Sequence, residues 1–111
     1  MATREGSLIH GNLDVLILRA LSEGPSHGYG IARWVHAATD AALVVEDRAL
    51  YIALHRLEER GWLAASWGAS ENNRRARYYR LSSSGRRALA RKQREWSALA
   101  GAMFKALGIK P

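Results

Sequence analysis

Arginines gather in one short stretch of this 111-residue chain, where they could neutralise phosphate groups. Arg74, Arg75 and Arg77 follow the turn-forming residues 68–73, Gly-Ala-Ser-Glu-Asn-Asn, and run into residues 78–81, Tyr-Tyr-Arg-Leu, which favour a strand. Guanidinium groups at the tip of a hairpin can make charge-assisted hydrogen bonds to phosphate oxygens. The segment is therefore suited to binding the backbone of a nucleic acid.

A helix that could enter a DNA groove precedes this hairpin. Residues 50–63 read Leu-Tyr-Ile-Ala-Leu-His-Arg-Leu-Glu-Glu-Arg-Gly-Trp-Leu, a helix ended by Gly61 and followed at once by a strand. One apolar stripe of this helix is formed by Leu50, Leu54 and Leu57. If that stripe faces inward, Arg48 and His55 lie on or near the exposed face. A helix followed by an arginine-tipped hairpin is typical of a winged helix-turn-helix on DNA.

Several side chains of this helix have alternative roles. Arg48 is expected to contact a base or a phosphate, because a guanidinium can clamp guanine or phosphate. His55 and Arg56 could equally be solvated, or paired with the glutamates at 58–59. Tyr51 could pack against the preceding helix, with or without its hydroxyl reaching a phosphate.

The charge distribution also favours an anionic partner. The chain has a net charge of +7 and a pI of about 10.6. The segment from 74 to 94 contains no acid and nine cations, Arg74, Arg75, Arg77, Arg80, Arg86, Arg87, Arg91, Lys92 and Arg94. A solvated basic face is the alternative, but an unbroken run of one sign repels itself. Arg77 and Arg80 alternate with the tyrosines and could instead line a sheet edge.

Two helices are expected before the DNA-reading helix. Residues 1–7 are small and polar and are predicted to form a flexible arm. Apolar residues at helical spacing predict an amphipathic helix over 12–22, capped by Asn12 and stopped by Gly24-Pro25. Ser26 is expected to cap a second helix over about 27–38.

The remaining elements complete a mostly helical α+β fold. Asp47 is expected to cap the third helix, and 62–67 and 77–81 are predicted strands of a two-stranded wing. One of Ser82, Ser83 and Ser84 is expected to cap a long last helix that ends near 107. We therefore predict a winged helix-turn-helix domain over 1–81, and a C-terminal dimerisation helix within 82–111 that belongs to the same compact unit.

The last helix carries an apolar seam that predicts a homodimer. The seam consists of Leu89, Trp96, Leu99, Met103 and Leu107, which are spaced 7, 3, 4 and 4 residues apart. Phe104 lies beside this seam. Folding back onto its own core is the alternative. Two Trp96 indoles paired across a two-fold axis could hold a planar small molecule, whereas the alternative is that Trp96 simply fills the dimer core.

Other classes of protein are disfavoured. The chain has no cysteine, and its histidines at 10, 27, 36 and 55 form no metal-ligand pattern, so neither a metal nor a cofactor is expected. No nucleophile-base-acid set or glycine-rich phosphate loop is visible, and we predict no catalytic residues and no enzyme. Without a long apolar run or a signal peptide, the chain is expected to be cytoplasmic and not to bind membranes.

The order and spacing of several motifs resemble the PadR family of bacterial transcriptional regulators, over about residues 8–107. The motifs are Gly-Asn-Leu-Asp-Val-Leu-Ile-Leu at 11–18, His-Gly-Tyr-Gly-Ile-Ala at 27–32, Leu-Tyr at 50–51, Ala-Leu-His-Arg-Leu-Glu at 53–58, Gly-Trp-Leu at 61–63, Trp-Gly at 67–68, Ser-Glu-Asn-Asn-Arg-Arg-Ala-Arg-Tyr-Tyr-Arg-Leu at 70–81 and Gly-Arg at 85–86. The chain is most similar to short members with a single C-terminal helix.

This resemblance implies a winged-helix dimer that represses transcription from an operator, and that in some relatives is released by a small planar or aromatic compound. Residues 47–60 would be the recognition helix. The implied DNA contacts are His27 and Tyr29 at the start of the second helix, Tyr51, and the wing residues Arg74, Arg75 and Arg77. Close relatives have small residues before Leu-Tyr and a proline after it, where this chain has Arg48, Ala49 and Ile52. This departure bears on the operator sequence.

Two other functions fit part of the pattern. A winged-helix adaptor that binds proteins without reading DNA has no need of the acid-free basic run from 74 to 94. An RNA-binding protein would more often display aromatic side chains on an open sheet face for base stacking. Tyr78 and Tyr79 are neighbours in a strand and must face opposite sides, so they make no such platform.

Overall fold

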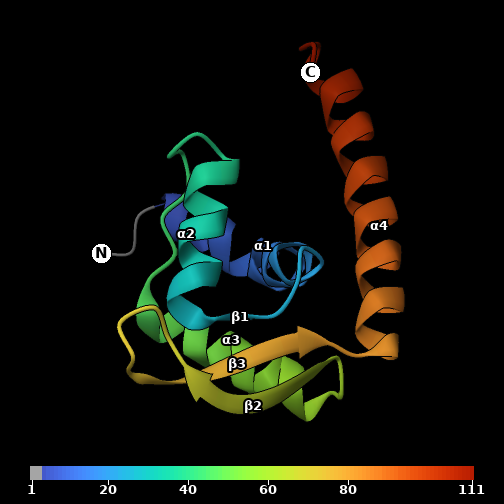
Figure 1. The fold of residues 1–111 in the computed structure, drawn as a ribbon. Coiled ribbons are helices and arrows are strands. Elements are labelled where there is room, and N and C mark those ends of the chain that lie inside the picture. Colours follow the sequence, from blue (N-terminus) through green and yellow to red (C-terminus); the bar gives the residue numbers. More distant parts are fainter. Residues whose placement is uncertain (1–3) are drawn as a thin grey trace.

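The computed structural model describes the backbone of residues 4–111 and the side chains of residues 12–111 (Figure 1). Its elements in chain order are α1 (Arg4–Leu21), β1 (Ser26–His27), α2 (Gly28–Ala38), α3 (Asp47–Glu59), β2 (Leu63–Ala69), β3 (Arg75–Leu81) and α4 (Ser83–Leu107). Helices α1 and α3 pack against a small three-stranded antiparallel sheet, α2 packs on α1 and α3, and α4 follows the sheet. The predicted mostly helical winged helix-turn-helix with a long C-terminal helix is confirmed.

Helix α1 is longer than predicted. It begins at Arg4, so Asn12 lies inside the helix and does not cap it. No proline occurs between 4 and 12, and nothing in that stretch forces the helix to start later. The expected flexible arm at 1–7 is therefore wrong for residues 4–7, which belong to α1. Residues 1–3 lie outside the described residues.

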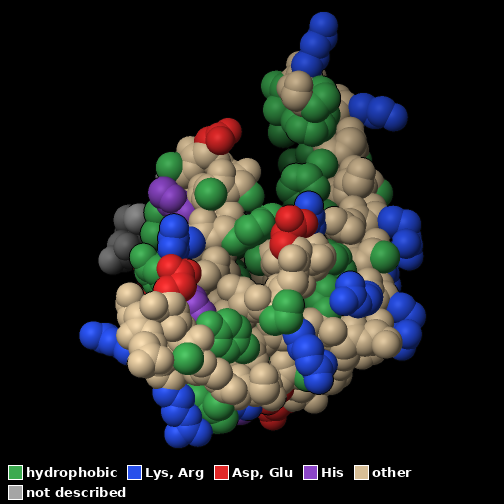
Figure 2. All heavy atoms as spheres, viewed as in Figure 1, with side chains coloured by type: hydrophobic (Ala, Val, Ile, Leu, Met, Phe, Trp, Pro, Cys, Tyr) green, Lys and Arg blue, Asp and Glu red, His purple; other side chains and the backbone are tan. Residues whose placement is uncertain are grey.

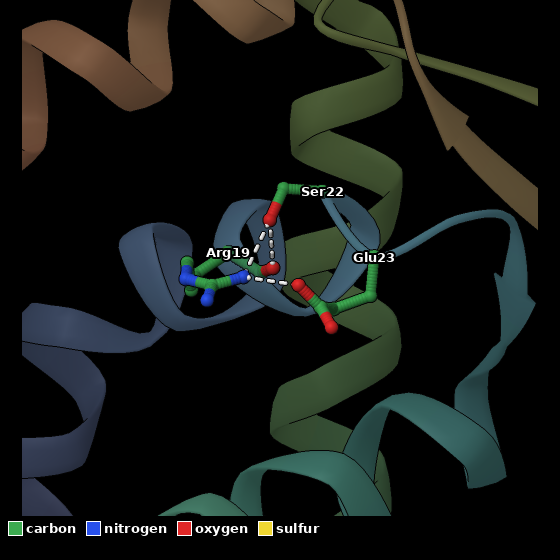
Figure 3. Close-up of polar contacts among 3 residues, drawn as sticks. All are labelled: Arg19, Ser22 and Glu23. Atoms are coloured by element: carbon green, nitrogen blue, oxygen red, sulfur yellow. Dashed lines mark hydrogen bonds and ion pairs between the residues drawn. The ribbon is translucent and has the colours of Figure 1, made fainter.

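The C-terminal end of α1 is held by a local polar cluster (Figure 3). The Arg19 Nη1 group donates hydrogen bonds to Ser22 Oγ at 2.7 Å and to Glu23 Oε2 at 2.9 Å. The Ser22 hydroxyl in turn donates to the Arg19 carbonyl oxygen at 2.6 Å. The Arg19 guanidinium also lies 5.4 Å from the Trp34 ring centroid of α2. The helix then ends, as predicted, before Gly24-Pro25.

The start of α2 differs from the prediction in its cap. Ser26 belongs to the short strand β1, and His27 occupies the cap position, with its Nδ1 accepting a hydrogen bond from the Gly30 N–H at 3.0 Å. Strand β1 pairs antiparallel with β3, with Ser26 opposite Tyr79. The two-residue strand carries no alternation that a sequence could display, so it was missed.

The wing is a hairpin of two seven-residue strands, longer than predicted. Strand β2 pairs with β3 from Leu63 opposite Leu81 to Ala69 opposite Arg75. Helix α3, which precedes the hairpin, begins with Asp47 as its first helical residue. The cap position is Glu46, whose side chain makes no capping bond, so the expected Asp47 cap is wrong.

The hydrophobic core lies between the helices and the sheet. The predicted inward stripe of α3 is fully buried, as are Ile17 and Leu18 of α1 and Ile31 and Val35 of α2. Leu89 of α4 is only 8% exposed and belongs to this same core. Its assignment to the dimer seam is therefore corrected, because its side chain is already covered by its own chain.

Helix α4 extends well past the core that its first turns cover (Figure 1). The Ser82 hydroxyl accepts a hydrogen bond from the Gly85 N–H at 3.0 Å and caps the helix, and Gly108 ends it in a left-handed conformation. Beyond Leu89 the apolar residues are uncovered: Trp96, Leu99, Met103 and Leu107 are between 47% and 61% exposed. Within the described residues no helix is long and apolar enough to cross a membrane.

Candidate nucleic-acid interface

A groove of about 620 Å³ lies where the start of α2, the start of α3 and the wing meet. It collects residues that are up to 52 positions apart in the chain, from His27 to Tyr79. Six of the eight predicted DNA contacts line it: His27, Tyr29, Tyr51, Arg74, Arg75 and Arg77. Arg48 and His55 are exposed on α3 outside this lining. The fold thus assembles one cationic and aromatic surface from three elements.

The α2 side of the groove offers hydrogen-bond donors. Because His27 Nδ1 accepts the capping bond, the neutral ring carries its proton on Nε2, which remains a donor. The N–H groups of the first turn of a helix also favour an anion. Tyr29 is 68% exposed, and the guanidinium of Arg33 lies 5.6 Å from its ring centroid. This end of α2 is therefore chemically suited to a phosphate.

Tyr51 joins α3 to the start of α2. A Cβ atom at Gly28 would lie 2.8 Å from the Tyr51 hydroxyl oxygen, so the Tyr51 ring lies directly against the backbone at the start of α2. Tyr51 nevertheless stays 52% exposed. Packing against α2, one of the two roles considered for Tyr51, is thus observed, and the side chain keeps enough free surface to reach a ligand in the groove.

The exposed face of α3 carries Arg48, Ile52 and His55. His55 Nε2 lies 3.4 Å from Glu59 Oε1, and both side chains are largely exposed. Such a surface pair holds its partners weakly, so His55 remains able to exchange Glu59 for another anion. Arg56 pairs with Asp14 of α1 and with neither of the glutamates at 58–59. Arg56 is therefore engaged in holding α3 on α1.

The wing contains a residue that the sequence reasoning missed. The guanidinium of Arg75 lies 4.3 Å from the ring centroid of Trp67, and that of Arg77 lies 5.9 Å away. Trp67 is 57% exposed and lines the groove. Trp67 is on the same face of β2 as the buried Leu63. It is nevertheless exposed, because the hairpin extends past the core at the wing tip. The sequence feature that could have identified Trp67 was a large aromatic residue on the first strand of the hairpin, opposite the arginine-rich second strand.

The wing arginines differ in how they are held. Arg77 forms an ion pair with Glu58 of α3 at 2.7 Å, whereas Arg75 is held by cation–π contact alone among its described contacts. Burial raises the pKa of the neighbouring Tyr79, and the Arg77 guanidinium opposes this shift. Tyr79 is therefore a neutral phenol at physiological pH and adds no negative charge to the groove.

Trp96 does not line this groove and lies instead on the side of α4 that faces α1. Its indole N–H donates to Asn12 Oδ1 of α1 at 3.1 Å. With apolar residues of α1 and Leu43 it lines a hollow of about 490 Å³ between α1 and α4. Within the described part of the chain, no cluster of three or more histidine and carboxylate side chains could hold a metal ion.

Comparisons with known proteins identify the class of this chain. Residues 17–91 match the Transcriptional regulator PadR-like family. A transcriptional regulator from Clostridium thermocellum has a similar structure, with a TM-score of 0.80 and 33% identity, covering 89% of this chain and 96% of that one. A PadR family regulator from Eggerthella lenta gives 0.75 and 31%, covering 91% and 86%. An uncharacterized protein from Lysinibacillus sphaericus is 30% identical over 90 residues, 81% of this chain and 83% of that one. The chain belongs to the PadR-like family of transcriptional regulators, winged-helix proteins that bind DNA and are not enzymes.

Proposed function

We propose that this regulator is a homodimeric repressor that reads a pseudo-palindromic operator. In each half-site, α3 enters the major groove and the wing lies along the adjacent backbone. The observation that carries the proposal is the convergence of six predicted contacts in one groove beside the exposed face of α3. Arg74 and Arg75 neutralise phosphates, Arg77 supports them, and Arg48 reads a base edge or a phosphate.

Dimerisation is assigned to the uncovered row on α4. Its exposed members are Trp96, Leu99, Met103 and Leu107, with the partly exposed Phe104 beside them. A row of exposed large apolar groups on a projecting helix favours a partner surface of the same kind. A two-fold axis through this row would set the recognition helices on half-sites about 10 bp, or a multiple of that distance, apart.

A small planar or aromatic effector is proposed to act at the hollow beside Trp96. The hollow is mainly apolar in its lining and adjoins the proposed dimer contact. The indole N–H is already satisfied by Asn12, which leaves the ring face for stacking. Two Trp96 side chains related by the dimer axis would enclose a planar molecule. The alternative, in which Trp96 only fills the dimer core, predicts no such binding.

The direct test is binding to the DNA upstream of the protein's own gene, compared with an unrelated duplex of equal length across a salt series. We expect tighter binding to the upstream fragment that survives physiological salt, because base contacts add to the salt-sensitive phosphate term. Equal and steeply salt-dependent binding to both duplexes would mean another operator or an architectural role. Absence of binding at low salt would favour the adaptor function.

Arg75→Glu is expected to weaken binding to operator and unrelated DNA alike. The change removes a phosphate contact at the wing of each protomer. A plot of the logarithm of the binding constant against the logarithm of the salt concentration should therefore become less steep by about 0.9 for each protomer. Lys110→Glu, the same charge reversal at the far end of the chain, serves as control. An Arg75→Glu protein with the wild-type salt slope would exclude a phosphate role for this residue.

Arg48→Ala is expected to change sequence preference more than overall affinity. A bidentate arginine contact to guanine discriminates against a wrong base by about 1–3 kcal/mol, or roughly 5-fold to 150-fold. Selection of bound sequences from a randomised half-site, for wild type and variant, would locate the position that loses its preference. A uniform loss of affinity with an unchanged selected motif would show that Arg48 contacts backbone only.

A further inference from the structure

Helix α4 carries a second basic surface, on the side opposite its apolar row. Arg87, Arg91 and Arg94 are spaced i, i+4 and i+7, so they share one face of the helix, and all three are exposed. At 100° per residue this face points away from Trp96 and Met103. Figure 2 shows Lys and Arg side chains along the outer side of α4 and hydrophobic ones on its inner side. We call these three arginines the α4 basic face.

The α4 basic face is separate from the groove at the wing. The hairpin register places Leu81 opposite Leu63 at the end next to α4, and Arg75 opposite Ala69 at the wing tip. Seven residues of strand at about 3.3 Å each put these two ends about 20 Å apart. The cations of α4 therefore cannot contact the same phosphates as the wing arginines.

The charge of this face is not balanced by any ion pair among the described residues. The described residues form four ion pairs, and none includes an arginine of the α4 basic face. The single acid of α4, Glu95, lines a hollow towards α1 with Asp14. A row of like charges without counterions raises the free energy of the folded chain, and an anionic partner removes that cost.

An adjacent indole holds part of this charge in place. The ring of Trp62 has three cationic groups within 6 Å of its centroid, the guanidinium groups of Arg60 and Arg91 at 5.1 and 5.8 Å and Lys92 Nζ at 5.5 Å. Cation–π contact orders these long side chains before any partner binds. The charge on this side of the molecule is thus concentrated where α3 ends and α4 begins.

We propose that the α4 basic face binds the phosphate backbone of the operator-bearing duplex, in the DNA that flanks the half-site contacted by α3 and the wing. The inference rests on the proposed DNA-binding function. A duplex bound at the groove brings a continuous polyanion next to the protein, and 20 Å corresponds to about six base pairs. From Arg87 to Arg94 the helix rises about 10 Å, which spans about three phosphates of one strand. The surface therefore lengthens the footprint without reading sequence.

The test compares two duplexes, the footprinted upstream fragment trimmed to the operator and the same fragment extended by about one helical turn at each end. The variant is Arg87→Gln with Arg94→Gln, since both side chains are exposed and neither belongs to the core. The matched control is Lys105→Gln with Lys110→Gln, which removes the same charge near the C-terminus. Affinities are measured across a salt series.

We expect the variant to bind the extended duplex at least about tenfold more weakly, with a salt slope smaller by about 3.6 for a dimer that loses four phosphate contacts. Binding to the trimmed duplex should match wild type, and the control should be unchanged on both. Wild-type affinity of the variant on the extended duplex would overturn the proposal, as would an equal loss on both duplexes. Capture of a second, separate duplex by the wild type, lost in the variant, would assign the face to DNA bridging instead. Absence of any wild-type footprint on the upstream fragment, even at low salt, would count against the proposed function itself, before the two duplexes are compared.

Discussion

Leu99→Glu is expected to convert the proposed dimer into a monomer and to remove operator binding. Leu99 is 60% exposed in the middle of the uncovered row of α4, so the change does not disturb the core of one chain. In a two-fold interface each substitution occurs twice. Two buried leucines worth about 1.5–3 kcal/mol each would be lost, and two carboxylates would be forced out of water.

The consequence for DNA is larger than that for the protein. A monomer contacts one half-site, and the second half-site no longer benefits from a high effective concentration. Affinity for the full operator should therefore fall by about 100-fold to 10,000-fold. Sedimentation at several protein concentrations measures the assembly, and a binding titration with the full operator measures the affinity.

Ala98→Glu is the matched control for the assembly state alone, because it adds the same charge on the side of α4 that carries the α4 basic face, opposite the uncovered row. It is expected to remain dimeric. If the Leu99→Glu protein also sediments as a dimer, the uncovered row is not the dimer contact. If the Leu99→Glu protein is monomeric but binds the operator with wild-type affinity, the proposal that a dimer binds two half-sites of a pseudo-palindrome is wrong.

Gly85→Ala is expected to destabilise the protein more than any exposed substitution described above. Gly85 is buried in the first turn of α4, and a Cβ atom there would collide with the backbone carbonyl oxygen of Trp62. That carbonyl also accepts a hydrogen bond from the Ser82 N–H at 3.0 Å, so neither backbone can move freely. The free energy of unfolding should fall by about 3 kcal/mol, and the Tm by roughly 10–20 °C.

Gly101→Ala provides the comparison within the same helix. A Cβ atom at Gly101 meets nothing within 4 Å, so alanine there should be neutral or stabilise the helix by up to about 1 kcal/mol. Thermal unfolding is compared at one protein concentration, because a dimer's Tm depends on concentration. Equal Tm values for the two variants would show that α4 does not need its close approach to Trp62.

The sequence alone determined the features that depend on local pattern. Apolar residues at helical spacing placed the inward stripe of α3, and Gly61 marked the helix end before the wing. Turn residues followed by arginines located the hairpin, and the serines at 82–84 located the start of α4. These signals are short-range because propensity, capping and turn chemistry act between residues close in the chain. They sufficed for the fold class, whereas the family was indicated by the resemblance in the order and spacing of whole motifs.

The tertiary structure decided which of several local options each residue takes. Arg56 could have paired with the adjacent glutamates, yet it pairs with Asp14, which is 42 residues away. Leu89 continued the apolar seam of α4 in sequence, but it is buried in the core of its own chain. Trp67 gained its place beside the wing arginines only because the hairpin extends past the core. In each case the outcome depends on packing between distant elements, because contact and solvent exclusion are properties of the folded arrangement that no local pattern contains.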